Sequence, residues 1–171
     1  CEPSDGGIVF VNPAATTSKI PYDDFTTNAA HTIKDALTAM QANDNIVIAS
    51  GTYTENNNVV THGGVLAGLA GNWTVSDPST NTTAPYSDFF DYSLLPIIKP
   101  GASATASLLR GDGVEGGSQL LIGGLEFAGG KAGEIASVNA GGAIRLENIG
   151  SLPVSIGFCQ FTTNSAADFG G

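Results

Sequence analysis

Hydrophobic residues in this chain occur in short runs, and glycine-rich or polar segments separate one run from the next. Short apolar runs bounded by turn residues predict β-strands rather than long helices. Residues 46–48 form such a run, Gly51 interrupts it, and residues 52–55 resume it. The other predicted strands lie within residues 8–13, 94–100, 106–113, 118–130, 141–150 and 152–161.

One segment has the spacing of a helix instead. Ile33, Ala36, Leu37 and Met40 recur at helical intervals, which predicts an amphipathic helix with a core-facing stripe. Thr32, followed three residues later by Asp35, predicts a capping pair at its start. The pattern ends near residues 42–44, and no alternation of strands with helices follows. This disfavours a doubly wound α/β sheet.

The patterns divide the chain into a short polar tether at residues 1–7 and a single domain at residues 8–171. Residues 8–45 are interpreted as a cap and residues 46–171 as successive coils. Gly63, Gly64, Gly68 and Gly71 predict tight bends at coil corners. Residues 74–93 are polar and rich in turn residues, so they predict a long surface loop. Two-residue hairpin signals are scarce, which disfavours an antiparallel sandwich.

The last part of the chain repeats an earlier part. Phe127 aligns with Phe161, Gly130 with Asn164 and Ala132 with Ala166, at a spacing of 34 residues. Gly141-Gly142 aligns with Gly170-Gly171 if the intervening segment is shortened. Self-similarity of this kind predicts stacked units that bury their apolar faces on one another. The Asn or Gly at the turn is expected to have a positive φ, and stacked Asn side chains are expected to form a ladder.

These elements resemble those of right-handed parallel β-helix surface proteins. Gly141-Gly142-Ala143-Ile144 and Phe161-Thr162-Thr163-Asn164 are similar to the repeats of polymorphic outer-membrane proteins. Residues 8–13, 32–41 and 43–56 resemble the strand, capping helix and first coil of pectin-lyase-like proteins, and residues 64–79 resemble the coil that follows. The resemblance implies an all-β fold, a parallel β-helix with an N-terminal capping helix. It implies little about activity, because such folds host many functions.

The repeat is expected to lack a C-terminal cap. Phe161 and Asn164 belong to the last complete unit, and Gly170 and Gly171 stand where a further strand is expected. Two interpretations are open: the chain belongs to a longer protein, or another subunit completes the stack. The second predicts head-to-tail association into a filament.

Net charge and the two cysteines limit the classes of partner that the sequence allows. The formal net charge of −10 excludes nucleic acid and peripheral binding to anionic lipid. Cys1 followed by polar residues resembles the start of a mature bacterial lipoprotein, which implies a lipid on Cys1 and a location on the outer-membrane surface. Membrane contact is expected only through that lipid. Cys159 is interpreted as a small buried hydrophobe.

Candidate chemistry is sparse. Asp112 and Glu115 are the weak candidates for Ca²⁺, which binds oxygen ligands. The Arg-Gly-Asp-Gly segment at residues 110–113 is interpreted as a turn in which Asp112 bonds its own backbone. His31 is expected at the helix start, and His62 is far from it in sequence. Trp73, Tyr86, Phe89 and Tyr92 are candidates for stacking on sugar rings.

Two hypotheses follow. The first is a non-enzymatic bacterial surface protein with a structural, adhesive or self-assembly role, whose partners are itself or other surface proteins. The second is a protein that binds or degrades polysaccharides, as a lyase or glycoside hydrolase. Such enzymes need clustered acids or two facing carboxylates, and the acids considered are Asp23, Asp24, Asp88, Asp91, Asp112 and Glu115, with Arg110 and Arg145 as the only arginines.

Overall fold

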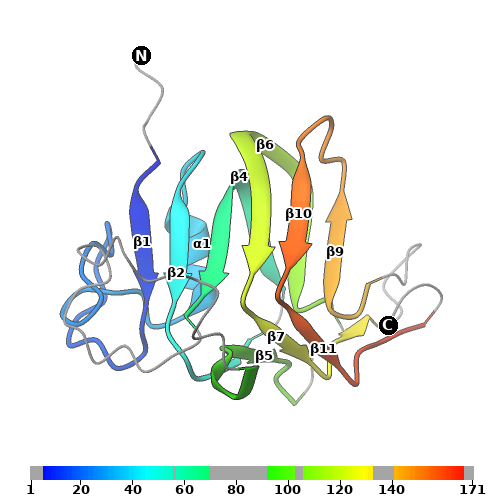
Figure 1. Cartoon of the computed structure of the whole chain (residues 1–171), viewed down its shortest axis with the longest axis horizontal. Helices are drawn as coiled ribbons and strands as arrows, with labels where there is room; N and C mark the ends of the chain where they lie inside the picture. Colours follow the sequence, from blue (N-terminus) through cyan, green and yellow to red (C-terminus); the bar gives the residue numbers. More distant parts are fainter. Residues whose placement is uncertain (1–5, 56, 70–91, 103–105, 133–140, 168–171) are drawn as a thin grey trace.

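The protein is rich in β-strands that form parallel sheets, with one α-helix in the described part of the chain. The computed structural model describes residues 6–55, 57–69, 92–102, 106–132 and 141–167 (Figure 1). The elements are β1 (Ile8–Val11), α1 (Ile33–Ala39), β2 (Asn45–Ile48), β3 (Thr52–Thr54), β4 (Asn58–Gly68), the 3₁₀ turn η1 (Tyr92–Leu94), β5 (Ile97–Lys99), β6 (Leu109–Gly123), β7 (Glu126–Ala128), β8 (Lys131–Ala132), β9 (Ile144–Glu147), β10 (Val154–Gly157), β11 (Gln160–Thr162) and β12 (Ser165–Ala166). Each predicted strand segment overlaps at least one of these strands.

The largest sheet follows the order of the sequence. Its strands run β1-β2-β4-β6-β10, and β9 pairs with the first part of β6 (Figure 1). β4 and β6 are long because each continues through an irregularity in register, between Val60 and Gly64 on β4. In this order each strand therefore pairs with the strand of this sheet that precedes it in the sequence and with one that follows it.

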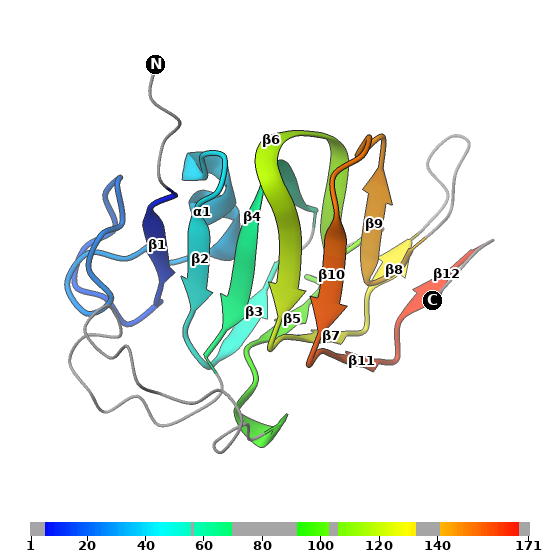
Figure 2. The same cartoon turned by 45° about the horizontal axis from the view of Figure 1, so that its top comes forward.

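Two smaller sheets continue the same pattern. One has the order β3-β5-β7-β11, and the other pairs β8 with β12 (Figure 2). All pairings between these named strands are parallel. The expectation that the chain avoids antiparallel hairpins and forms no closed barrel is confirmed for the described strands.

The 34-residue spacing is confirmed by the pairing register. Val154 pairs with Leu120, Phe161 with Phe127 and Ala166 with Ala132, so three strands in three sheets share the same offset. The rings of Phe127 and Phe161 stack, with centroids 5.5 Å apart and planes 12° from parallel. The repeat seen in the sequence is thus a repeat of strand pairs.

The core consists of rows of side chains in register. Ile46, Leu66 and Ile122 are adjacent in the largest sheet, and each has no exposed surface. Tyr53, Ile98 and Phe127 form the corresponding row in the second sheet, and they belong to the same hydrophobic cluster. Burying each such side chain contributes about 1.5–3 kcal/mol. One continuous core therefore connects the strands of both sheets.

The helix and its Thr32 cap are confirmed as the sequence predicts, and the structure adds a second capping residue. Ile33, Ala36, Leu37 and Met40 are buried in the same cluster as the sheet residues. The Thr32 hydroxyl accepts a hydrogen bond from the Asp35 amide at 3.0 Å. The distant Glu55 supplies further acceptors, because its carboxylate accepts from the amides of Ile33 at 3.1 Å and Lys34 at 3.0 Å. The loop after β3 thus fastens the helix to the sheet.

Replacing Glu55 with alanine should lower the free energy of unfolding by about 1–2 kcal/mol, because two amides at a helix start lose their acceptor. Burial raises the pKa of the Glu55 carboxyl above 4.5. A raised pKa favours folding below the unfolded value, and this contribution is lost as pH rises through the folded value. The difference between wild type and Glu55→Ala should therefore be larger at pH 4 than at pH 8 in urea unfolding. An equal difference at both pH values would contradict this assignment.

The sequence predicted tight bends at the glycines of β4, and this prediction was wrong for the described ones. Gly63, Gly64 and Gly68 lie within the strand. A Cβ on Gly64 would lie 2.4 Å from the Asp44 carbonyl oxygen and 2.6 Å from the Met40 side chain. The reason for these glycines is close packing against neighbouring backbone rather than chain reversal. Gly71 lies outside the described residues.

The left-handed positions of the repeat lie elsewhere than predicted. Gly129 has φ +70° and its counterpart Thr163 has φ +52°, whereas Asn164 is not among the residues with positive φ. Asn164 also forms no ladder with another Asn, because Gly130 occupies the equivalent position. Its side chain accepts from the Gly130 amide and donates to the Phe127 carbonyl, both at 2.8 Å. Asn164 therefore connects the repeat that contains β11 and β12 to the preceding repeat, which contains β7 and β8. We call each such repeat of strands a layer.

Replacing Thr163 with glycine should raise the free energy of unfolding by up to about 1 kcal/mol. The left-handed conformation costs a residue with a Cβ about 1–2 kcal/mol, and the greater flexibility of unfolded glycine offsets part of this gain. The matched control is Ser165→Gly in β12, which should destabilise the protein by about 0.5–1 kcal/mol. Thermal unfolding followed by circular dichroism measures both, and a destabilised Thr163→Gly variant would argue against strain at this position.

Candidate functional site

The most distinctive surface of the described chain is the edge formed by β10, β11 and β12, called here the terminal edge. These strands are the last of their respective sheet orders. Ile156 is 46% exposed and Phe161 is 50% exposed, although their partners Ile122 and Phe127 are fully buried. Phe158, between the two strands, is 71% exposed. Positions that are buried on β6 and β7 are therefore exposed apolar surface on their partners β10 and β11.

The described strands of the terminal edge lack the charged and proline residues that usually protect an edge strand. Its strands have the sequences VSIG, QFT and SA, so none of them carries a charged or proline residue. Natural sheets commonly blunt exposed edges with such residues to prevent pairing with other chains. β9 also has an open side, but it carries the charged residues Arg145 and Glu147. The uncharged part of this end is therefore the part most able to accept another strand.

The opposite end of the largest sheet is covered by its own chain. On β1, the Phe10 amide donates to the Tyr22 carbonyl at 3.1 Å, and the Phe10 carbonyl accepts from the Ala30 amide at 2.8 Å. The Asn12 amide donates to the Ala30 carbonyl at 2.9 Å. The Phe10 ring packs edge-on against Phe25, with centroids 5.8 Å apart, and only 3% of Phe10 is exposed. The two ends of the sheet therefore differ in their capacity for pairing.

Side-chain contacts join the terminal edge to the preceding layer, which contains β7 and β8. The Thr162 hydroxyl donates to the Glu126 carboxylate at 2.9 Å, next to the paired rings of Phe127 and Phe161. Asn164 bonds the backbone on both sides of the same corner. Phe161 and Asn164, which the sequence singled out, therefore lie at this edge. Gly170 and Gly171 lie outside the described residues.

A second feature is a pair of matching ion pairs on β6 and β9. Arg110 pairs in register with Arg145, and Asp112 with Glu147. Within each strand, an arginine Nη2 atom contacts a carboxylate: Arg110 to Asp112 at 3.0 Å and Arg145 to Glu147 at 2.7 Å. The Arg-Gly-Asp segment is therefore part of a strand, and its interpretation as a turn was wrong. Asp112 bonds side chains rather than its own backbone, because the adjacent strand layer brings Asn148 within 2.8 Å.

The Asp112 carboxylate is poorly suited to proton transfer. The hydrogen bond from Asn148 and the interaction with Arg110 lower the pKa of Asp112, so this carboxyl stays ionised near neutral pH. Glu147 is paired with Arg145. A glycosidase needs one protonated carboxyl as its acid, and the lowered pKa makes Asp112 poorly suited to that role.

The predicted Ca²⁺ ligands do not form a cluster in the described residues. Glu115 lies in register with His62, past the irregularity that separates it from the pairing of Asp112. No group of three or more His, Cys, Asp or Glu side chains able to hold a metal occurs among the described residues. Ca²⁺ binding by Asp112 and Glu115 stays a prediction.

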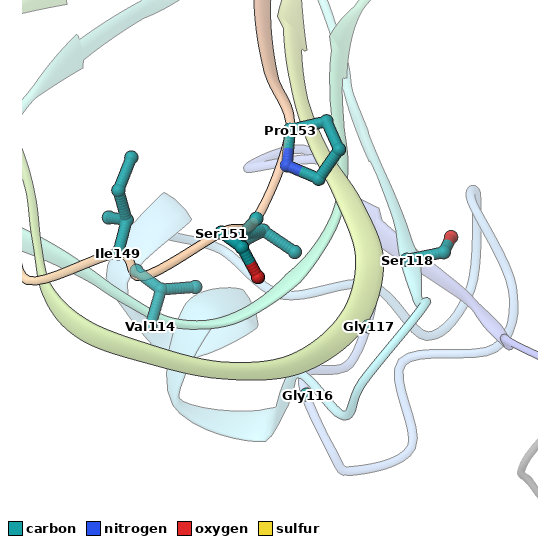
Figure 3. Close-up of a pocket in the computed structure, with 8 residues that line it drawn as sticks. Val114, Gly116, Gly117, Ser118, Ile149, Ser151 and Pro153 are labelled. Atoms are coloured by element: carbon teal, nitrogen blue, oxygen red, sulfur yellow. The ribbon is translucent and has the colours of Figure 1, made fainter.

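A shallow hollow of about 330 Å³ lies where β6 curves outward (Figure 3). Val114 and residues 116–118 line one side, and Ile149 and residues 151–153 line the other. The hollow has only small polar and aliphatic lining residues, with no charged or aromatic side chain among them. It therefore lacks the convergent polar groups that mark a catalytic or ligand site.

The remaining predicted residues are structural or outside the described part. The ring Nε2 of His31 lies 3.0 Å from the Ala15 carbonyl oxygen, just before the helix, and the His62 Nδ1 lies 3.0 Å from the Thr61 hydroxyl. Cys159 is half-buried against the core, and burial raises the pKa of its thiol. Asp24 closes a local turn, and hydrogen bonds from the amides of Thr27 and Thr26 lower its pKa to about 2.

The candidate sugar-stacking residues cannot be placed. Trp73, Tyr86 and Phe89 lie outside the described residues, as do Asp88, Asp91 and Cys1. Tyr92 begins η1, and its side chain also lies outside the description. Polysaccharide binding therefore stays a prediction of the sequence.

Sequence reasoning missed Ile156 and Phe158 as members of the terminal edge. The signal was present, because a 34-residue offset places Ile156 beside Ile122 and Phe158 beside Gly124. Gly124 has φ +65° and Phe158 has φ +54°, so the same corner recurs with a large exposed ring in place of glycine.

No protein-family model, curated protein or solved structure gives a significant match to the chain. Among the helices of the described residues, none is long and apolar enough to cross a bilayer.

Proposed function

We propose that the protein is a non-enzymatic structural component of a bacterial surface, and that it self-assembles through the terminal edge. The proposed architecture is a right-handed parallel β-helix. Parallel pairing in three sheets, a shared 34-residue offset and one continuous core support this architecture. The surface location, the adhesive role and the lipid on Cys1 rest on the resemblance of the sequence to surface β-helix and lipoprotein families.

One observation carries the proposal of self-assembly. Ile156 and Phe161 are about half exposed, whereas their partners in the neighbouring layer are completely buried. Removing apolar surface of this kind from water favours association. Among the described strands, β10, β11 and β12 each pair with one neighbour only, so their other sides offer backbone hydrogen bonds as well. A second copy of this chain supplies strands with the same alternation of apolar and polar positions.

Analytical ultracentrifugation of the whole chain over a range of concentrations should reveal self-association. Ile156→Glu should weaken the association at least about tenfold, because a buried unpaired charge opposes contact. Val59→Glu is the matched control. Val59 is 37% exposed on β4 and lies beside Arg110, away from the terminal edge. It should leave the association unchanged.

Circular dichroism must show that both glutamate variants remain folded. A wild-type chain that stays monomeric at every concentration would overturn the proposal. So would association that Ile156→Glu and Val59→Glu weaken equally.

A further inference from the structure

We infer that the junction where the chain enters β1 is a mechanical clamp, which passes a pull on the residues before Gly6 into the body of the protein. The clamp consists of the Asp44 carboxylate and its bonds to the amides of Gly7 and Gln41, and it is called here the Asp44 clamp. The inference rests on one part of the proposed function, attachment to a surface through the segment before β1. It does not require self-assembly.

Asp44 is a buried acid whose two oxygens both bind backbone. Only 7% of the residue is exposed. Its Oδ1 accepts from the Gly7 amide and its Oδ2 accepts from the Gln41 amide, each at 2.7 Å. A carboxylate is costly to bury unless hydrogen bonds replace its water, and bonds to a charged acceptor are stronger than neutral ones. Asp44 therefore joins the start of β1 firmly to the turn that follows α1.

The chain is also fitted closely against this turn. A Cβ on Gly6 would overlap the carbonyl oxygen of Asn43, so the backbone passes where no side chain fits. The Gly7 carbonyl accepts from the Asn45 amide at 2.8 Å. Both backbone groups of Gly7 are thus bonded to successive residues, Asp44 and Asn45.

The turn after α1 spreads a pull over further strands. The Asn43 amide donates to the Gly63 carbonyl at 2.8 Å, and the Val65 amide donates to the Asp44 carbonyl at 2.9 Å, both on β4. The Asn43 side chain accepts from the Ser118 amide of β6 at 2.8 Å. A pull that reaches this turn is therefore shared by β4 and β6 as well as β2.

β1 itself is placed to resist a pull along its axis. It lies parallel to β2, in register from Ile8 to Val11 (Figure 1). On its other side, Phe10 bonds the backbone of Tyr22 and Ala30. A force along the strand has to break the bonds on both sides together rather than one after another. β1 therefore slides out only when the whole set of bonds fails.

Pulling single molecules at constant force in optical tweezers measures the clamp. One pair of handles is attached at Cys1 and Thr52→Cys, in a Cys159→Ala background, because Thr52 is exposed on the strand that follows β2. This pair loads β1 along its axis. The second pair, Ile20→Cys and Thr52→Cys with Cys1→Ser, pulls on the loop beside β1, where Ile20 is 70% exposed.

The first pair should survive about tenfold longer than the second at equal force, because the bonds of Asp44 and Asn45 to Gly7 must break at the same time. Asp44→Asn keeps the size of the side chain but replaces one acceptor oxygen with a donor. It should make rupture through the Cys1 handle about tenfold faster. Rupture through the Ile20 handle should change much less, which a merely stabilising role of Asp44 does not predict.

Asp112→Asn is the matched control, because Asp112 also accepts two hydrogen bonds but lies on β6, away from β1. It should leave rupture through the Cys1 handle unchanged. Circular dichroism shows whether each variant is folded. If Asp44→Asn does not fold, Gly6→Ala takes its place, since a Cβ there pushes the chain away from the turn and should also speed rupture.

Equal lifetimes for the two handle pairs in the wild type would overturn the inference. Equal effects of Asp44→Asn and Asp112→Asn would also overturn it. Because single chains are pulled, neither result depends on self-association. A clamp found in a chain that stays monomeric in ultracentrifugation would overturn the proposed self-assembly and leave this inference intact.

Discussion

Replacing Phe127 with alanine should lower the free energy of unfolding by about 3–5 kcal/mol. Phe127 is fully buried, and it pairs in register with Ile98 on one side and Phe161 on the other. The substitution removes a large apolar side chain, leaves a cavity in the row that joins neighbouring strand layers, and ends the ring stack with Phe161. Urea unfolding monitored by circular dichroism measures the effect.

Phe161→Ala is the matched control for this substitution. Phe161 belongs to the same row and the same ring stack, but half of its surface is exposed. Its loss should therefore cost clearly less than the loss of Phe127. Equal costs would mean that the core does not extend from layer to layer as the register indicates.

Replacing Gly68 with alanine should destabilise the protein by about 3 kcal/mol, the upper end of the usual cost of overpacking, because a contact with backbone has little room to relax. A Cβ on Gly68 would lie 1.8 Å from the Gly124 carbonyl oxygen and 2.9 Å from the Pro96 ring. Both contacts involve neighbouring strand layers, so relief requires separation of paired strands. Thermal unfolding of the variant should show a large fall in midpoint temperature.

Gly101→Ala serves as the control, because a Cβ at that position would have no neighbour within 4 Å. It should change stability by less than about 0.5 kcal/mol, as surface substitutions usually do. If Gly68→Ala is tolerated as well as Gly101→Ala, the close approach of β4 to the chain after β6 is not as described.

Most of the fold could be predicted from the sequence because its signals are local. Ile33, Ala36 and Leu37 mark the helix by their spacing alone. The aligned pair Phe127 and Phe161 gave the correct register, since parallel layers preserve the order of side chains. These features need no knowledge of which distant segment becomes the neighbour.

The errors concern contacts across long sequence separations. The acceptor role of Glu55 at the helix start depends on a residue 22 positions away, and no local motif announces it. The surroundings of Asp112 depend on Asn148, 36 positions later. The prediction of a positive φ at Asn164 was wrong because Thr163, a β-branched residue, takes the left-handed conformation instead. To predict the terminal edge, one needs both the repeat and the exposure of the equivalent residues in each repeat.

The second sheet pairs segments that are joined by connections of very different length. Thr52 pairs with Ile97, 45 residues on, and Ile97 pairs with Glu126, only 29 residues on, yet both pairs lie in the same row of strands. Insertions between strands therefore need not disturb the stacking. Because the entropic cost of closing a loop rises only slowly with its length, a connection can lengthen or change its sequence while the row of buried residues stays the same.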